Sequence, residues 1–115
     1  MKYQGGVGKM NNSDIIIQTI LALKKYPKMY LRGDVSYLKI ESYLNGYFTA
    51  LGQLYSVELK KLMGLWFQEK VNQNSSYPFT AHVDFYYKDK SEDERINILI
   101  DLVEEFFQEN PEWHL

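Results

Sequence analysis

The sequence predicts a small all-α domain of four to five helices. Apolar residues recur at helical spacing along most of the chain, and a helix-start signature precedes the last apolar run. Residues 79–87 also alternate like a strand, so an α+β domain with one short strand there is the alternative. No hairpin turn lies beside that segment, and a lone strand would leave its backbone groups unpaired, which favours a helix.

The expected organisation has three parts. Residues 1–12 are rich in Gly and Asn and are expected to form a flexible N-terminal segment. Residues 13–110 form a single helical domain, and residues 111–115 form a C-terminal tail. Gly5–Lys9 is similar to the end of a phosphate-binding loop, but it lacks a preceding strand and a Ser or Thr after the lysine, so nucleotide binding is not predicted.

The first helix is predicted to start with Ser13 as its N-cap and to end near Lys25 or Tyr26, because Pro27 disfavours helical geometry in the residue before it. Its apolar stripe contains Ile16, Ile20 and Leu23.

Residues 26–35 are expected to form an ordered connection with Met29, Tyr30 and Leu31 turned into the core. The RGD tripeptide at residues 32–34 is interpreted as a turn before the next helix rather than as an adhesion motif.

A second helix follows Ser36, and its stripe of period 3.6 continues for about five turns. Gly46 and Gly52 lie inside it, and close approach of another helix is the expected reason. Ser56 is the predicted N-cap of a third helix, on whose stripe Trp66 is expected to be a core anchor. The last helix starts at the capping box formed by residues 91–94 and ends at Asn110–Pro111.

The amino-acid composition excludes several kinds of functional site. Cysteine is absent, which excludes disulfides, thiolate metal sites and a cysteine nucleophile and favours a cytoplasmic location. No apolar run approaches the roughly 18 residues that span a bilayer. The only histidines, His82 and His114, match no metal-ligand or catalytic spacing, so no cofactor, metal or catalytic residue is predicted.

Charge is unevenly distributed. Residues 1–61 carry nine Lys or Arg against four Asp or Glu, whereas residues 62–115 carry four against eleven. Such asymmetry is typical of an interaction surface, or of two oppositely charged halves that pack together. The basic residues around Lys24–Lys39 are few and no recognition motif follows them, so nucleic-acid binding is not predicted.

Several short motifs resemble a loosely defined group of small bacterial proteins. They are Pro27-x-Met29-Tyr30-Leu31, Leu44-x-Gly46-Tyr47, the later Trp66 and a final acidic helix. Some such proteins look like immunity proteins that are paired with polymorphic toxins. The resemblance implies a bacterial, cytoplasmic binding protein rather than a catalyst.

The leading functional hypothesis is therefore a non-enzymatic protein-binding module, and the resemblance points to the immunity or antitoxin type. Its expected partner is a cationic protein, for example a toxin domain, and its expected binding surface is acidic. That surface is formed by Asp101, Glu104, Glu105 and Glu109. The alternative is a small-molecule-binding or regulatory domain whose aromatic pocket contains Tyr30, Tyr47 and Trp66.

Overall fold

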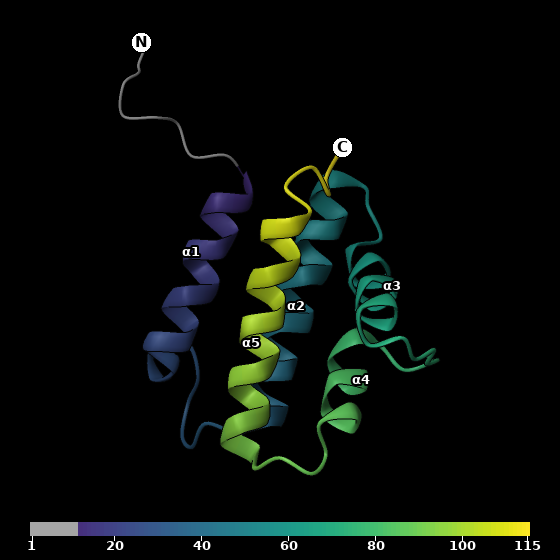
Figure 1. Cartoon of the computed structure of the whole chain (residues 1–115). Helices are drawn as coiled ribbons and strands as arrows, with labels where there is room; N and C mark the ends of the chain where they lie inside the picture. The colour runs from purple at the N-terminus through teal and green to yellow at the C-terminus, as the bar shows by residue number, and fades with distance from the viewer. Residues whose placement is uncertain (1–11) are drawn as a thin grey trace.

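The computed structural model describes residues 12–115, which form five α-helices, one short 3-10 turn and no β-strand. The elements are α1 (Asn12–Lys25), η1 (Pro27–Met29), α2 (Tyr37–Tyr55), α3 (Leu59–Val71), α4 (Phe79–Tyr86) and α5 (Glu92–Glu109) (Figure 1). The predicted all-α class is confirmed for these residues. The flexible segment and the Gly5–Lys9 loop predicted near the N-terminus lie outside the described residues, apart from Asn12, which opens α1.

Helix α5 lies in the middle of the domain and packs against α1, α2 and α4, while α3 packs against α2 and α4 (Figure 1). Helix α1 runs antiparallel to α5. The Ser13 hydroxyl donates to the Pro111 carbonyl oxygen (3.1 Å) at one end, and Lys24 pairs with Asp101 further along. The first helix is therefore held mainly by the last one.

Helix α2 runs parallel to α5. The Tyr37 N–H donates to the Glu92 carboxylate (3.0 Å) near the start of both helices, and the Phe48 and Phe107 rings meet further on, with centroids 6.3 Å apart. Buried residues from all five helices form one core between them. Its largest fully buried side chains include Phe48, Phe67, Phe106, Phe107, Ile20 and Leu23.

Helix α4 occupies the segment for which the sequence left a strand as the alternative. Phe79, His82 and Val83 are buried, which is the spacing of one helical face. The Tyr37 hydroxyl donates to the carbonyl oxygen of Thr80 (2.7 Å) and so joins α4 to the start of α2. The preference for a helix over a strand is confirmed.

Two predicted helix starts are wrong. Helix α1 begins at Asn12, so Ser13 lies inside its first turn, where the hydroxyl is used by Pro111. Ser56 is instead the left-handed C-cap of α2 (φ 56°), and α3 begins three residues later, at Leu59. The Ser13 contact spans most of the chain, whereas the Ser56 N–H donates to Gln53 at the end of the preceding helix.

The connection after α1 is ordered, but its side chains are arranged differently from the prediction. Met29 is 77% exposed and Tyr30 is 38% exposed, so the inward orientation is wrong for both, and only Leu31 packs against the core. The Tyr30 and Leu31 N–H groups both donate to the Pro27 carbonyl oxygen (3.1 and 3.0 Å). Because a 3-10 turn has about three residues per turn, consecutive side chains point in different directions and cannot all face the core.

The RGD segment is a turn, as expected. Gly33 adopts a left-handed φ of 72°. The Lys39 ammonium donates to the carbonyl oxygens of Arg32 (2.6 Å) and Asp34 (2.8 Å), so the turn is fastened to the first turn of α2.

Close packing explains why glycine occupies one of the two positions in α2. A Cβ on Gly52 would lie 2.6 Å from the Val57 carbonyl oxygen, because the chain folds back tightly from α2 towards α3. The close neighbour is thus the connection itself rather than another helix. Gly46 is exposed, and a Cβ there would meet nothing within 4 Å.

The burial of the two tryptophans differs from the prediction. Trp113 lies in the segment expected to be a tail, yet it is only 6% exposed and its ring meets Tyr55 and Phe107, with centroids 5.3 and 5.9 Å apart. Trp66, the expected core anchor, is only partly buried and sets its ring edge-to-face with Phe106 (5.6 Å). The chain turns back at Asn110, whose carbonyl oxygen accepts from the Trp113 N–H (3.1 Å), and this reversal brings Trp113 into the core.

Candidate functional site

The four acids predicted as a partner surface have partners within the chain. Asp101 pairs with Lys24 of α1, and Glu105 pairs with Lys70 of α3. Glu104 accepts a hydrogen bond from Gln108 on its own helix (3.3 Å).

Glu109 is also occupied, because its carboxylate accepts from the Trp66 indole N–H (3.0 Å). This hydrogen bond holds the pKa of Glu109 below its usual value, and the bond to Glu105 raises the pKa of Lys70. Three of these four acids therefore bridge to neighbouring helices, and among the four only Glu104 has its partner on its own helix.

The residues of the predicted aromatic pocket do not contact one another directly. Tyr30 and Tyr47 both contact Tyr43, with ring centroids 5.7 and 6.4 Å apart. Trp66 instead packs on Phe106 of α5. Between Tyr47 and Trp66 the chain of ring contacts passes through the buried Phe48, Phe107 and Phe106. A ligand site at Tyr30, Tyr47 and Trp66 therefore stays a prediction.

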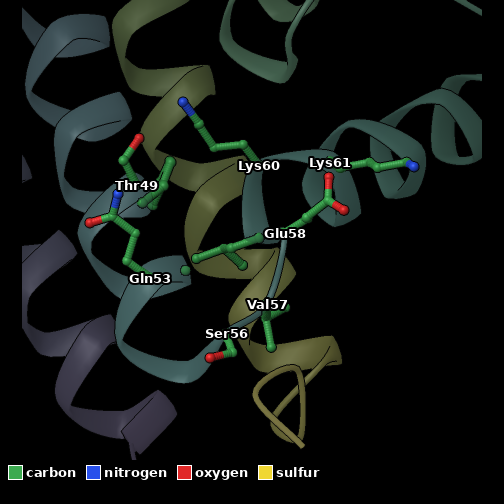
Figure 2. A pocket seen from close by; sticks show the side chains of 10 residues that line it. Thr49, Gln53, Ser56, Val57, Glu58, Lys60 and Lys61 are labelled. Carbon is green, nitrogen blue, oxygen red and sulfur yellow. The ribbon is translucent and has the colours of Figure 1, made fainter.

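A concave site lies beside α3. We use the name α3 groove for a hollow of about 520 Å³ between α2, α3 and the chain that leads into α4. Helix α3 contributes Lys60, Lys61, Gly64, Leu65 and Gln68, and the opposite wall is Ser75–Phe79. A second hollow of about 350 Å³, shown in Figure 2, shares Lys60 and Lys61 with it.

Hydrogen bonds hold the walls of the α3 groove in place. The Gln68 side-chain amide donates to the Ser75 carbonyl oxygen (3.1 Å), and the Ser75 hydroxyl accepts from the Tyr77 N–H (3.0 Å). The Asn45 amide donates to the Thr80 hydroxyl (3.2 Å) and ties α2 to α4 behind the groove. A groove held in this way loses little conformational freedom when it is occupied.

Apolar side chains remain exposed around the groove. Leu65 and Tyr77 are each 53% exposed, although Phe79 beneath them is buried. The Tyr77 ring meets Phe85 of α4 edge-to-face (6.0 Å), and Phe85 is 49% exposed. These residues extend the apolar surface from α3 to α4.

Two lysines stand at the rim. Within residues 12–115, no ion pair or hydrogen bond involves the ammonium group of Lys60 or Lys61. Figure 2 shows their side chains leaving α3 in opposite directions. Glu58 lines the smaller hollow, whereas the lining of the α3 groove contains no acid.

His82, on α4, is buried and is not accessible to a substrate. Its Nε2 lies 2.9 Å from the Gln73 side-chain oxygen, and its ring sets edge-to-face with Phe67 (4.9 Å). Asp84 pairs with Arg95 and not with His82. Burial lowers the pKa of His82, so the neutral ring is favoured in the fold.

The described part of the chain offers neither a metal-binding cluster nor a membrane-spanning helix. Between residues 12 and 115, no group of three or more His, Asp or Glu side chains is placed to hold a metal ion. None of its helices has the length and apolar character that a bilayer span requires.

Sequence patterns do not single out the residues of the groove. Lys60 and Lys61 contribute only to the charge balance, and Leu65 lies off the apolar stripe of α3. One signal was available, because two adjacent lysines in the first turn of a helix oppose the helix dipole. Tyr77 offered no comparable signal, since its position depends on how the α3–α4 connection folds.

Comparison with known protein families, with curated proteins and with solved structures finds no match to this chain. The resemblance to small bacterial proteins of the immunity type therefore remains a prediction.

Proposed function

We propose that this chain is a protein-binding module that acts without catalysis and receives its partner in the α3 groove. The observation that carries the proposal is the pair of half-exposed apolar side chains, Leu65 and Tyr77, beside a hollow of about 520 Å³. A single exposed apolar residue such as Leu54 is ordinary on a protein surface. An apolar wall around a pre-formed concavity is the arrangement that partner side chains fill.

The acidic surface of α5 is a weaker candidate for the same role. Its carboxylates would have to exchange Lys24, Lys70 and Trp66 for groups of the partner. Ion pairs exchanged in this way contribute little net affinity. The α3 groove requires no such exchange.

Crosslinking from a single position tests the proposal. A photoreactive amino acid replaces Leu65, and in a matched control it replaces Gln18, which is exposed on α1. We expect a discrete adduct with one protein from position 65 and none from position 18 in cells of the source organism. Equal labelling from both positions, or none from position 65, would refute the proposal.

A groove-filling variant controls for loss of folding. A Cβ on Gly64 would meet only the Phe79 backbone nitrogen, at 4.0 Å, so a larger side chain there can extend into the hollow. Gly64→Leu is expected to keep the thermal unfolding midpoint within a few degrees and to abolish the adduct from position 65.

The finer identity, a bacterial cytoplasmic immunity or antitoxin-like protein, is proposed on the resemblance of its short motifs alone. The neighbouring genes test it. A large toxin-like reading frame next to this gene supports neutralisation of a toxin, whereas an operon of metabolic enzymes favours a regulatory role.

A further inference from the structure

We propose that the α3 groove recognises an acidic segment of the partner protein, in which carboxylates meet Lys60 and Lys61 and an apolar side chain packs against Leu65 and Tyr77. This inference rests on the proposed function and specifies the chemistry of its partner. It reverses the expectation from the sequence, in which the partner is cationic and the acids of α5 bind it.

Charge is the first reason. The groove lining contains two ammonium groups and no carboxylate, and neither ammonium group has a partner within residues 12–115. Their side chains leave α3 in opposite directions, so they offer two separate positions for carboxylates (Figure 2). Two acidic side chains of one peptide can each gain a charge-assisted hydrogen bond there.

The position of the lysines on α3 is the second reason. They lie in the first turn of the helix, where the dipole disfavours positive charge, and that turn contains no acid. Glu58, at the N-cap, makes no side-chain capping bond. Glu58 supplies one negative charge at this end of the helix, and an anion that binds beside Lys60 and Lys61 adds a second favourable one.

The apolar wall selects a protein rather than another anion. A phosphate or a free carboxylate would use the lysines and leave Leu65 and Tyr77 in water. A nucleic acid would need a longer track of cations than two lysines on a chain of net charge −2. A peptide that places an apolar side chain between acidic ones uses both parts of the groove.

Groove binding can be mapped with a defined probe. The protein, labelled with ¹⁵N, is titrated with a short peptide in which glutamates flank one leucine and one phenylalanine. Two comparison peptides carry lysine for each glutamate or serine for each apolar residue. We expect amide shifts confined to residues 58–68 and 75–80 with the first peptide, and much smaller shifts with either comparison peptide.

Charge-reversed variants supply the quantitative test. Lys60→Glu/Lys61→Glu should weaken binding of the acidic peptide by about tenfold or more, with the largest effect at low salt. Its thermal midpoint should be unchanged or higher, because acids suit the start of a helix. Lys25→Glu/Lys28→Glu changes the net charge equally on the exposed α1–η1 connection and should leave the affinity within about twofold.

Each contrary result has a distinct meaning. Absence of shifts at millimolar peptide, shifts centred away from the groove, or equal weakening by the two charge-reversed pairs would overturn the inference. Stronger binding of a short single-stranded RNA to the same residues would also overturn it. If the crosslinked partner segment at position 65 is basic, the proposed function stands and the acidic specificity fails, whereas absence of any crosslink defeats the function itself.

Discussion

At the scale of single residues, neighbouring backbone decides what each helical glycine does. Gly46 and Gly52 lie in the same helix, six positions apart, and the sequence gives them the same status. Only the path of the chain after Tyr55 separates them, because it brings the Val57 carbonyl oxygen against Gly52. This contact depends on the left-handed Ser56, a conformation that a non-glycine residue seldom adopts and that the sequence does not announce.

The two glycines should respond oppositely to the same change. Gly46→Ala is expected to raise the free energy of unfolding by about 0.4–1 kcal/mol, since the added methyl group meets nothing and the unfolded chain loses freedom. Gly52→Ala should lower it by about 1–3 kcal/mol, because the connection to α3 must shift. Urea denaturation of both variants measures the difference, and a shift in the same direction for both would contradict the explanation.

His82 predicts a pH dependence of stability. Burial lowers its pKa in the folded state, so as pH falls below about 6.5 the unfolded chain takes up a proton that the folded chain resists. The free energy of unfolding should therefore decrease from pH 7.5 to 5.5, by at most about 1.4 kcal/mol per pH unit. His82→Gln provides the matched control. It is expected to be less stable at neutral pH and to lose most of this slope; an unchanged slope would assign the effect to other groups.

At the scale of elements, the start of α5 was clearly predictable from the sequence. The partners of its acidic side chains were not. Its capping box forms as the sequence indicates, with the Ser91 hydroxyl accepting from the Glu94 N–H (3.1 Å) and the Glu94 carboxylate accepting from the Ser91 N–H (3.0 Å). These signals are local and contained within four residues. The partners of Asp101, Glu105 and Glu109 are on α1 and α3, and no local pattern reports which helices will lie beside these acids.

The acids of α5 should differ in their contribution to stability. Glu105→Lys places a cation against Lys70 and removes an interhelical ion pair, so we expect it to lower the free energy of unfolding by about 0.2–1 kcal/mol. Glu104→Lys removes only a contact with Gln108 and serves as the matched control, expected to be near neutral. Chemical denaturation at low and high salt measures both, and the difference should shrink as salt rises. Equal effects would show that the pair with Lys70 contributes nothing.

At the scale of the whole molecule, the all-α class was predictable because four helices carry clear apolar stripes. The packing was not, since α1 and α5 are separated by most of the chain and meet through Ser13 and Pro111. The candidate site could not be predicted from the sequence for the same reason. Lys61 and Leu65 are neighbours on α3 by helical spacing, but Tyr77 joins them only when the α3–α4 connection folds over α3.

Removal of either tryptophan tests where the core ends. Trp113→Ala should lower the free energy of unfolding by about 3–5 kcal/mol, because a buried ring between Tyr55 and Phe107 is lost. Trp66→Ala should cost clearly less, since that ring is partly exposed. Denaturant titration followed by circular dichroism avoids the change in fluorescence, and a larger loss for Trp66 would place the anchor where the sequence analysis expected it.

The dependence of α1 on α5 has a consequence during synthesis. Helix α1 leaves the ribosome before the other four, but the surface that covers Ile16, Ile20 and Leu23 is made last. The nascent chain must therefore carry an uncovered apolar helix while α2, α3 and α4 emerge, and the fold closes only when α5 has been released. Such a late closure makes the half-made chain a natural client for chaperones that hold exposed apolar helices.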